Sequence, residues 1–140
     1  MTELVLDTNV LVSGMLSPSH SPGQVVDMLR SGVLRLVVDD RILREYRMVL
    51  RRPVFDRYLP LDARDWIIEF LEAESRRIVC TQPIVGLPDP SDACFLEVAA
   101  QANCPLVTGN HKHFPEALCD PVMVLSPREF IENRFGFGRE

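Results

Sequence analysis

Two carboxylates in the first third of the sequence lie where the apolar pattern turns their side chains inward. Asp7 directly follows the apolar run at 4–6, which predicts a short strand. Glu45 has Ile42 three residues before it and Val49 four residues after it, so it shares the apolar stripe of a predicted helix. A carboxylate on an inward face needs a partner, which is either an arginine or a cation.

The same spacing argument applies to a third carboxylate, Asp92. Phe95, Leu96 and Ala99 lie three, four and seven residues after it and define the inward face of a predicted helix. Glu97 lies five residues after Asp92 and is expected to face elsewhere. Taken alone, Asp92 would be favoured in the first turn of a helix by the helix dipole, whether or not it does chemistry.

Together, Asp7, Glu45 and Asp92 would repel one another strongly unless a cation neutralises them. We expect Mg²⁺ or Mn²⁺, because hard oxygen ligands select these ions and the sequence offers few paired His and Cys ligands for zinc. Either ion, held by carboxylates and completed by water and a substrate phosphate, suits the hydrolysis of phosphodiester bonds.

The elements that must position these side chains form an α/β pattern. Short apolar runs alternate with segments of helical period, which is typical of a mainly parallel sheet covered by helices on both faces. Such sheets bind ligands beyond the carboxyl ends of their strands, where Asp7, Asn9, Asn110 and His111 are expected. The expected strands cover 4–6, 34–38, 78–80, 105–108 and 122–125.

The expected helices begin at capping residues and end at helix breakers. In the helix that follows Pro60, we expect Trp66, Ile67, Phe70 and Leu71 to form the core stripe. Four other helices are expected. The first carries Val25, Val26 and Leu29 and ends at Gly32, and the second runs from Asp39 or Asp40 to about Arg52. The third is capped by Ser91 and runs from Asp92 to about Ala102, and the fourth begins near Ser126.

Length and composition predict one globular domain over residues 1–140, with 46% hydrophobic and 25% charged residues. No apolar run approaches the roughly 20 residues of a membrane span, and the acidic start of the chain is unlike a signal peptide, so we expect a cytoplasmic protein. The four cysteines form no Cys-x-x-Cys pair and are expected to be idle thiols.

The charge distribution bears on nucleic-acid binding. A formal net charge of −5 argues against a protein that coats nucleic acid, since phosphate binding usually leaves a basic excess. Six arginines nevertheless fall within seventeen residues: Arg41, Arg44, Arg47, Arg51, Arg52 and Arg57. They form either a solvated helix face or a face that contacts RNA, with Arg44 and Arg51 as the candidates for phosphate contacts.

Four segments in order resemble the PIN-domain family, and in particular its bacterial branch of VapC-like ribonucleases. They are LVLDTNVLVSG at the start, REYRMVLRRPVF around Glu45, LPDPSDACFLEVA around Asp92 and LVTGNHKHF near residue 110. The resemblance implies a three-layer α/β/α fold and an acidic pocket that binds Mg²⁺ or Mn²⁺ and cuts RNA internally. It implies that Asp7, Glu45 and Asp92 are the catalytic and metal-binding acids, with Asn9 and Thr108 in supporting roles.

The resemblance also implies partners. A VapC-like toxin has an RNA substrate and a cognate antitoxin protein that masks the acidic pocket, and we expect a homodimer or a higher homo-oligomer. The C-terminal aromatics bear on this expectation, because Phe130 and Ile131 suit the core whereas Phe135 and Phe137 suit either the core or an interface.

The sequence departs from the family at the fourth acidic position. Many PIN domains carry an aspartate just after the threonine or three residues later, and here those places hold Asn110 and His113. Asn110 is a weak metal ligand that brings no charge, and Asp89 is either a substitute charge or a turn former. His111 and His113 are expected to be loop histidines that form hydrogen bonds or meet phosphate, with metal ligation as the alternative.

One other function remains open from the sequence, and a further one is disfavoured. Asn110 in place of an acid favours a catalytically weak or inactive PIN domain that binds RNA or a protein without cutting. An aspartyl-phosphate enzyme or receiver-like switch is disfavoured, because the D-T-N segment at Asp7 lacks the second acid of such phosphatases and a receiver's phosphoacceptor follows a later strand.

Overall fold

Five parallel strands form the centre of the structure, a computed structural model that describes residues 2–133. They lie in the order β3-β2-β1-β4-β5, and the register pairs Leu4 with Leu36 and Val5 with Leu106. The parallel arrangement confirms the predicted α/β class. The strands are β1 (Thr2–Leu6), β2 (Leu34–Val38), β3 (Arg76–Arg77), β4 (Leu106–Val107) and β5 (Val124–Leu125).

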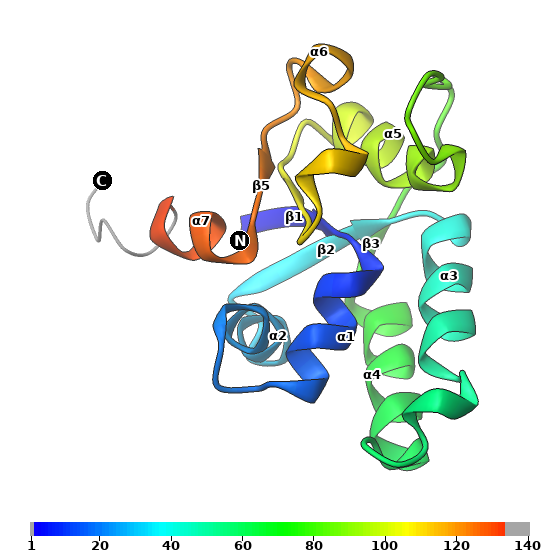
Figure 1. Cartoon of the computed structure of the whole chain (residues 1–140), viewed down its shortest axis with the longest axis vertical. Helices are drawn as coiled ribbons and strands as arrows, with labels where there is room; N and C mark the ends of the chain where they lie inside the picture. Colours follow the sequence, from blue (N-terminus) through cyan, green and yellow to red (C-terminus); the bar gives the residue numbers. More distant parts are fainter. Residues whose placement is uncertain (1, 134–140) are drawn as a thin grey trace.

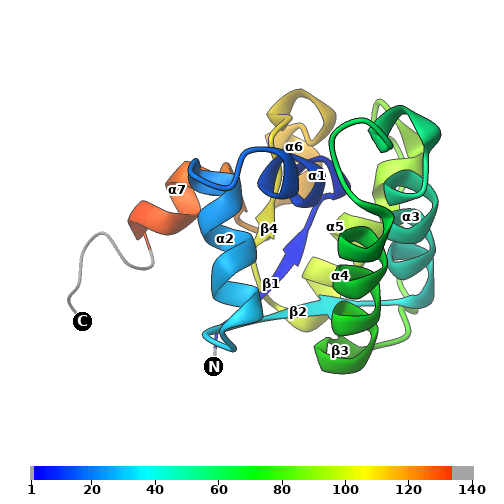
Figure 2. The same ribbon diagram turned by 90° about the horizontal axis from the view of Figure 1, so that it is seen from below.

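The helices cover both faces of the sheet, as predicted. Figures 1 and 2 show α1, α2 and α4 on one face and α5 and α6 on the other, with α3 beside the carboxyl ends of the strands. Right-handed crossovers explain this division, because the chain moves from β1 through β2 to β3 in one direction and to β4 and β5 in the other. The helices are α1 (Thr8–Leu16), α2 (Ser21–Arg30), α3 (Asp40–Leu50), α4 (Leu61–Glu74), α5 (Ala93–Ala102), α6 (Glu116–Cys119) and α7 (Pro127–Ile131).

The direction of winding reverses between β1 and β4, and this is where a doubly wound sheet opens a crevice at its carboxyl edge. The Asp7 backbone N–H donates to the Val107 carbonyl at 2.9 Å, and the Thr108 N–H donates to Leu125 at 2.9 Å. Asp7 and Thr108 are therefore neighbours at the switch point, although 101 positions separate them in the sequence.

Helix α1 was not predicted from the sequence, and it begins directly after Asp7. Its apolar residues follow one another too closely to show a clear helical period, because Val10 and Leu11 are buried and Val12 is half-buried. Gly14 lets α1 approach α2 closely, since a Cβ atom at this position would lie 2.6 Å from the Pro22 carbonyl oxygen. The packed pair holds the start of α1, and with it Asp7, against the sheet.

Three further expectations are wrong in detail. The third strand is Arg76–Arg77 rather than 78–80, because an edge strand needs no apolar run, although the Ile78 N–H still donates to Val38. Asp89, not Ser91, caps the turn Pro90–Asp92 (η2) that precedes α5. Trp66 is 51% exposed and stacks on Phe70 at the flank of α4, while Ile67 and Leu71 supply the core contacts.

Several predicted features are confirmed. The Asp39 side chain caps α3 by accepting from the Ile42 N–H at 3.0 Å, and Ser126 forms a capping box with Glu129 at the start of α7. Phe130 is fully buried and Ile131 packs against the core, whereas Phe135 and Phe137 lie outside the described residues. The four cysteines are free thiols.

Within residues 2–133, none of the helices is long and apolar enough to cross a membrane.

Candidate metal centre

Asp7 lies at the carboxyl end of β1, and only 6% of its surface is exposed. The Thr108 hydroxyl donates to Asp7 Oδ2 at 2.7 Å, and the Asn110 backbone N–H donates in turn to Thr108 Oγ1 at 3.0 Å. A longer contact of 3.4 Å joins the Gly109 N–H to Asn9 Oδ1. The loops after β1 and β4 are thus tied together at the switch point, and the Asp7 carboxylate has a fixed orientation.

Glu45 reaches the same end of the sheet from α3. The Thr8 hydroxyl donates to Glu45 Oε2 at 3.0 Å, and Thr8 is the first residue of α1. Beside Glu45, the buried Tyr46 hydroxyl donates to the Leu6 carbonyl, which fastens α3 to the end of β1. The half-buried Glu45 carboxylate therefore lies next to Asp7 as the sequence pattern predicted, and its negative charge contributes to raising the pKa of Asp7.

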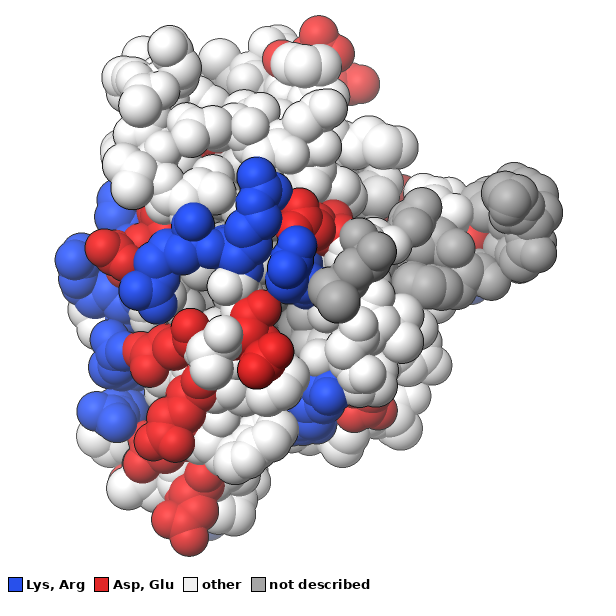
Figure 3. Space-filling model, turned by 180° about the vertical axis from the view of Figure 1, so that it is seen from behind, with Lys and Arg blue, Asp and Glu red and all other residues white. Residues whose placement is uncertain are grey.

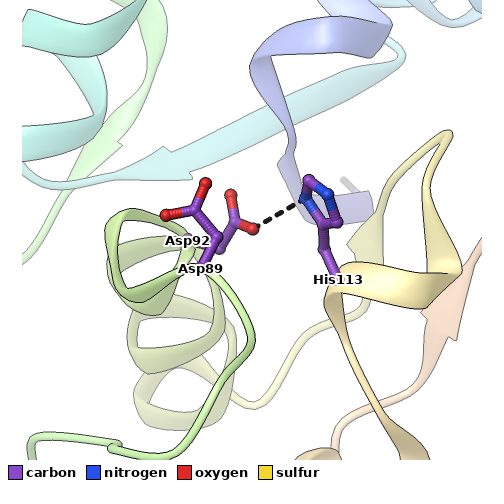
Figure 4. A group of neighbouring side chains, drawn as sticks. All are labelled: Asp89, Asp92 and His113. Atoms are coloured by element: carbon purple, nitrogen blue, oxygen red, sulfur yellow. Dashed lines mark ion pairs between the residues drawn. The ribbon is translucent and has the colours of Figure 1, made fainter.

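Asp92, Asp89 and His113 form a group whose potential ligand atoms all lie within 4.8 Å of one another. Figure 4 shows Asp89 and Asp92 on the turn before α5 and His113 facing them from the turn after β4. His113 Nδ1 is 2.9 Å from Asp92 Oδ2, yet this buried oxygen accepts no aligned hydrogen bond from the described residues. Asp89 is exposed and accepts from the backbone N–H and hydroxyl of Ser91, which agrees with its possible role as a turn former.

Burial and mutual repulsion disturb the titration of the acids. Burial raises the pKa of Asp92 to about 6, and the negative charge of Asp7 adds to the effect, while His113 opposes it. Burial also raises the pKa of Asp7, although the hydrogen bond from Thr108 counteracts this and Glu45 adds to it. Asp7 is thus coupled to Glu45 on one side and to Asp92 on the other.

This arrangement fits a divalent cation. Asp92 Oδ2 is a buried acceptor that lacks an aligned donor, and such an atom is costly unless a proton or a metal satisfies it. Carboxylate oxygens with one imidazole nearby are ligands for a hard or borderline divalent ion. Of the three predicted ligands, only Asp92 belongs to the group with Asp89 and His113, whereas Asp7 and Glu45 lie outside it and stay predicted ligands. His113 joins the candidates because the fold brings it to Asp92.

An ion-pair hub holds the segments that carry these acids. Arg41 at the start of α3 pairs with Asp39 at 2.7 Å and with Glu97 of α5 at 2.9 Å. Glu97 also accepts from the Ile84 N–H at 2.9 Å, so it binds the loop that leads to Asp92. Glu97 faces elsewhere than Asp92, as expected, because it pairs with Arg41 and does not belong to the group around Asp92. It is nevertheless only 7% exposed, because α5 is enclosed on nearly all sides.

The arginines of α3 differ in their freedom to meet a phosphate. Arg51 pairs with Asp65 at 3.2 Å and Arg47 pairs with Glu72, whereas Arg44 is exposed and has no ion pair within residues 2–133. On the face drawn in Figure 3 the basic side chains gather in a band, and acidic side chains lie within and below this band. Arg44, next to Glu45 in the sequence, therefore remains the stronger of the two candidates for a phosphate contact.

The two histidines and Asn110 separate in space. His111 faces Glu129 of α7, with 3.7 Å between Nε2 and Oε1, and it takes no part in the group around Asp92. Asn110 is half-buried, and its side-chain amide makes no hydrogen bond to the described residues. Sequence spacing alone cannot separate His113 from His111, because only the folded turn shows which of them faces Asp92.

Comparison with known proteins places the chain in a family. A sequence model of the PIN domain matches residues 3–112. The chain belongs to the PIN-domain family. An uncharacterized protein of Methanocaldococcus jannaschii, MJ1680, is 27% identical to this PIN domain over 141 residues, which cover 93% of this chain and 90% of that protein.

The fold also matches a solved structure. This is the crystal structure of VapBC2 from Rickettsia felis bound to a DNA fragment from their promoter, with a TM-score of 0.57 over 90% of this chain and 98% of that chain. The two sequences are 14% identical, so this likeness shows that the PIN fold is shared.

The raised pKa of Asp92 predicts a distinctive pH dependence of stability. Because the folded pKa of about 6 exceeds the ordinary value of 3.8, ionised Asp92 costs stability above pH 6, and that cost disappears as the pH falls below about 4. In metal-free protein, Asp92→Asn should raise the free energy of unfolding at pH 7.5 by about 1 kcal/mol, a value reduced for solvent screening. Urea unfolding of both proteins from pH 4 to pH 8 measures this gain.

Asp62→Asn is the matched control, because Asp62 is an exposed acid in the first turn of α4. It should show no gain at any pH, since it is exposed and does not belong to the group around Asp92. An Asp92→Asn variant that is destabilised at pH 7.5 in the absence of metal would contradict the repulsion described above.

Proposed function

We propose that this PIN domain is a metal-dependent endoribonuclease that hydrolyses RNA phosphodiester bonds, and that it is the toxin component of a type II toxin-antitoxin system. The observation that carries the proposal is the buried Asp92 oxygen without an aligned donor, set among further acids at the switch point of the sheet. Membership of the PIN-domain family supports the same chemistry.

In this proposal Asp7, Glu45 and Asp92 hold Mg²⁺ or Mn²⁺, and Asn110 is at most a weak ligand. When bound, the ion would supply an activated water and neutralise charge on the scissile phosphate. Thr108 fixes the Asp7 carboxylate and Thr8 fixes the Glu45 carboxylate through the hydrogen bonds described above. Preorganised acids of this kind need not rearrange when the substrate phosphate arrives.

The proposed partners follow from the family and from the likeness to VapBC2. We expect a cognate antitoxin protein to cover the acidic site, and we expect the chain to act as one domain in the cytoplasm, as a homodimer or higher homo-oligomer. An acidic pocket in a protein of net charge −5 suits an antitoxin that inserts an arginine or lysine. The MJ1680 protein, which is uncharacterized, gives no further guidance on partners.

One observation favours a second function, that of an RNA- or protein-binding module without catalysis. Asn110 and His113 occupy the places where many PIN domains carry their fourth acid, so the site holds less negative charge. Under this alternative, Asn110→Asp would make metal binding and RNA cleavage appear together in a protein that otherwise lacks both.

The main test is cleavage of a mixed panel of end-labelled RNAs with Mn²⁺, Mg²⁺ or EDTA. We expect cutting with metal and none with EDTA, and Asp92→Asn should reduce the rate by about 100-fold or more because it removes a charged ligand. Asp62→Asn is the control and should cut at the native rate. If the pure, folded protein cuts none of the RNAs with either metal, the binding module becomes the preferred function.

Arg44 and Arg51 form a matched pair for testing phosphate contacts. Arg44→Ala should weaken binding of a single-stranded RNA and reduce the slope of log Kd against log salt by about 0.7, since one phosphate contact is lost. Arg51→Ala should change neither, because Arg51 already pairs with Asp65. Fluorescence anisotropy in EDTA measures both without cleavage. Equal effects of the two substitutions would count against a specific contact by Arg44.

A further inference from the structure

We propose that His113 is a nitrogen ligand of the metal in this site, so that the site prefers Mn²⁺ over Mg²⁺. This inference rests on the metal site of the proposed function and concerns the composition of its ligands. The geometry around Asp92 carries it. His113 comes from the turn after β4, and the fold places its ring with the carboxylates of Asp89 and Asp92.

The contact between His113 and Asp92 has the geometry of two ligands of one ion. Nδ1 and Oδ2 are 2.9 Å apart, which is the distance of an ion pair, and this buried oxygen has no aligned hydrogen-bond donor among the described residues. Neighbouring ligands of an octahedral ion at about 2.1 Å are themselves about 3 Å apart. A cation that accepts electron pairs from both atoms would satisfy the buried oxygen as well as the imidazole.

The position of His113 is set by the backbone and by a buried anchor. It ends the short turn His111–His113 (η3), in which its N–H donates to the Asn110 carbonyl at 3.1 Å. The next residue, Phe114, is 3% exposed and packs into the core. Since Asn110 is tied to Thr108, and Thr108 to Asp7, the turn holds the imidazole at a fixed place beside the acids.

The types of ligand atom determine which metal ion the site prefers. Mg²⁺ favours oxygen ligands alone, whereas an imidazole nitrogen suits transition metals and the neighbouring carboxylates suit Mn²⁺. One nitrogen among carboxylates therefore shifts the preference from Mg²⁺ toward Mn²⁺. It also explains how the site can work without a fourth acid, because a neutral ligand that binds the ion directly replaces a charged one.

The test is Mn²⁺ binding to the full chain, followed by pulsed electron paramagnetic resonance and by calorimetry. In the native protein we expect modulation from a directly bound ¹⁴N nucleus, and Mn²⁺ binding about tenfold or more tighter than Mg²⁺. His113→Asp should abolish the ¹⁴N signal and narrow the preference for Mn²⁺. His113→Gln should abolish the signal too, and it provides a neutral substitution if the aspartate variant fails to fold.

His111→Gln is the matched control, because His111 lies in the same turn but faces Glu129. It should leave both the ¹⁴N signal and the affinities unchanged. Bound Mn²⁺ without a ¹⁴N signal, or with a signal that persists in both His113 variants, would overturn the inference and leave the proposed nuclease standing. A native protein that binds no Mn²⁺ would overturn both proposals.

Discussion

Repulsion among buried carboxylates at the carboxyl edge of the sheet is the constraint on which the rest of the structure depends. Asp7 and Asp92 are almost completely buried, and Glu45 is close enough to add to the raised pKa of Asp7. A fold that gathers such charges gives up stability in its metal-free form. The reversal of winding between β1 and β4 places Asp7 and Thr108 side by side at the carboxyl edge of the sheet, where a cation can offset this cost.

The surrounding structure holds the acids in place despite their repulsion. Thr108 orients Asp7 by a hydrogen bond, and Thr8 orients Glu45 in the same way. Arg41 bridges the start of α3 to Glu97 of α5, which also binds the loop before Asp92. The hydroxyl groups that donate to Asp7 and Glu45 are neutral, and Arg41 pairs with Asp39 and Glu97 instead. The negative charges of Asp7 and Glu45 therefore remain available to a metal.

The spacing of apolar residues predicted most of the helices and strands and the inward placement of the three acids, because an amphipathic pattern indicates which side chains are buried. Asp7 and Asp92 are inward as predicted, and Glu97 faces elsewhere than Asp92, although it too is buried because α5 is enclosed on nearly all sides. The apolar pattern missed α1, in which apolar residues follow one another too closely to show a period. His113 could not be distinguished from His111 in advance, because the choice depends on the direction of a short turn fixed by a buried neighbour.

The most direct test of the account is a crystal structure of the protein soaked in Mn²⁺, with the ion located by its anomalous scattering. We predict a peak within bonding distance of Asp92 and among the side chains of Asp7, Glu45 and His113, with Asp92 Oδ2 as one ligand. Well-ordered crystals that show no peak at Asp92, or a peak only at another place on the protein, would contradict the claim that these acids form a metal centre.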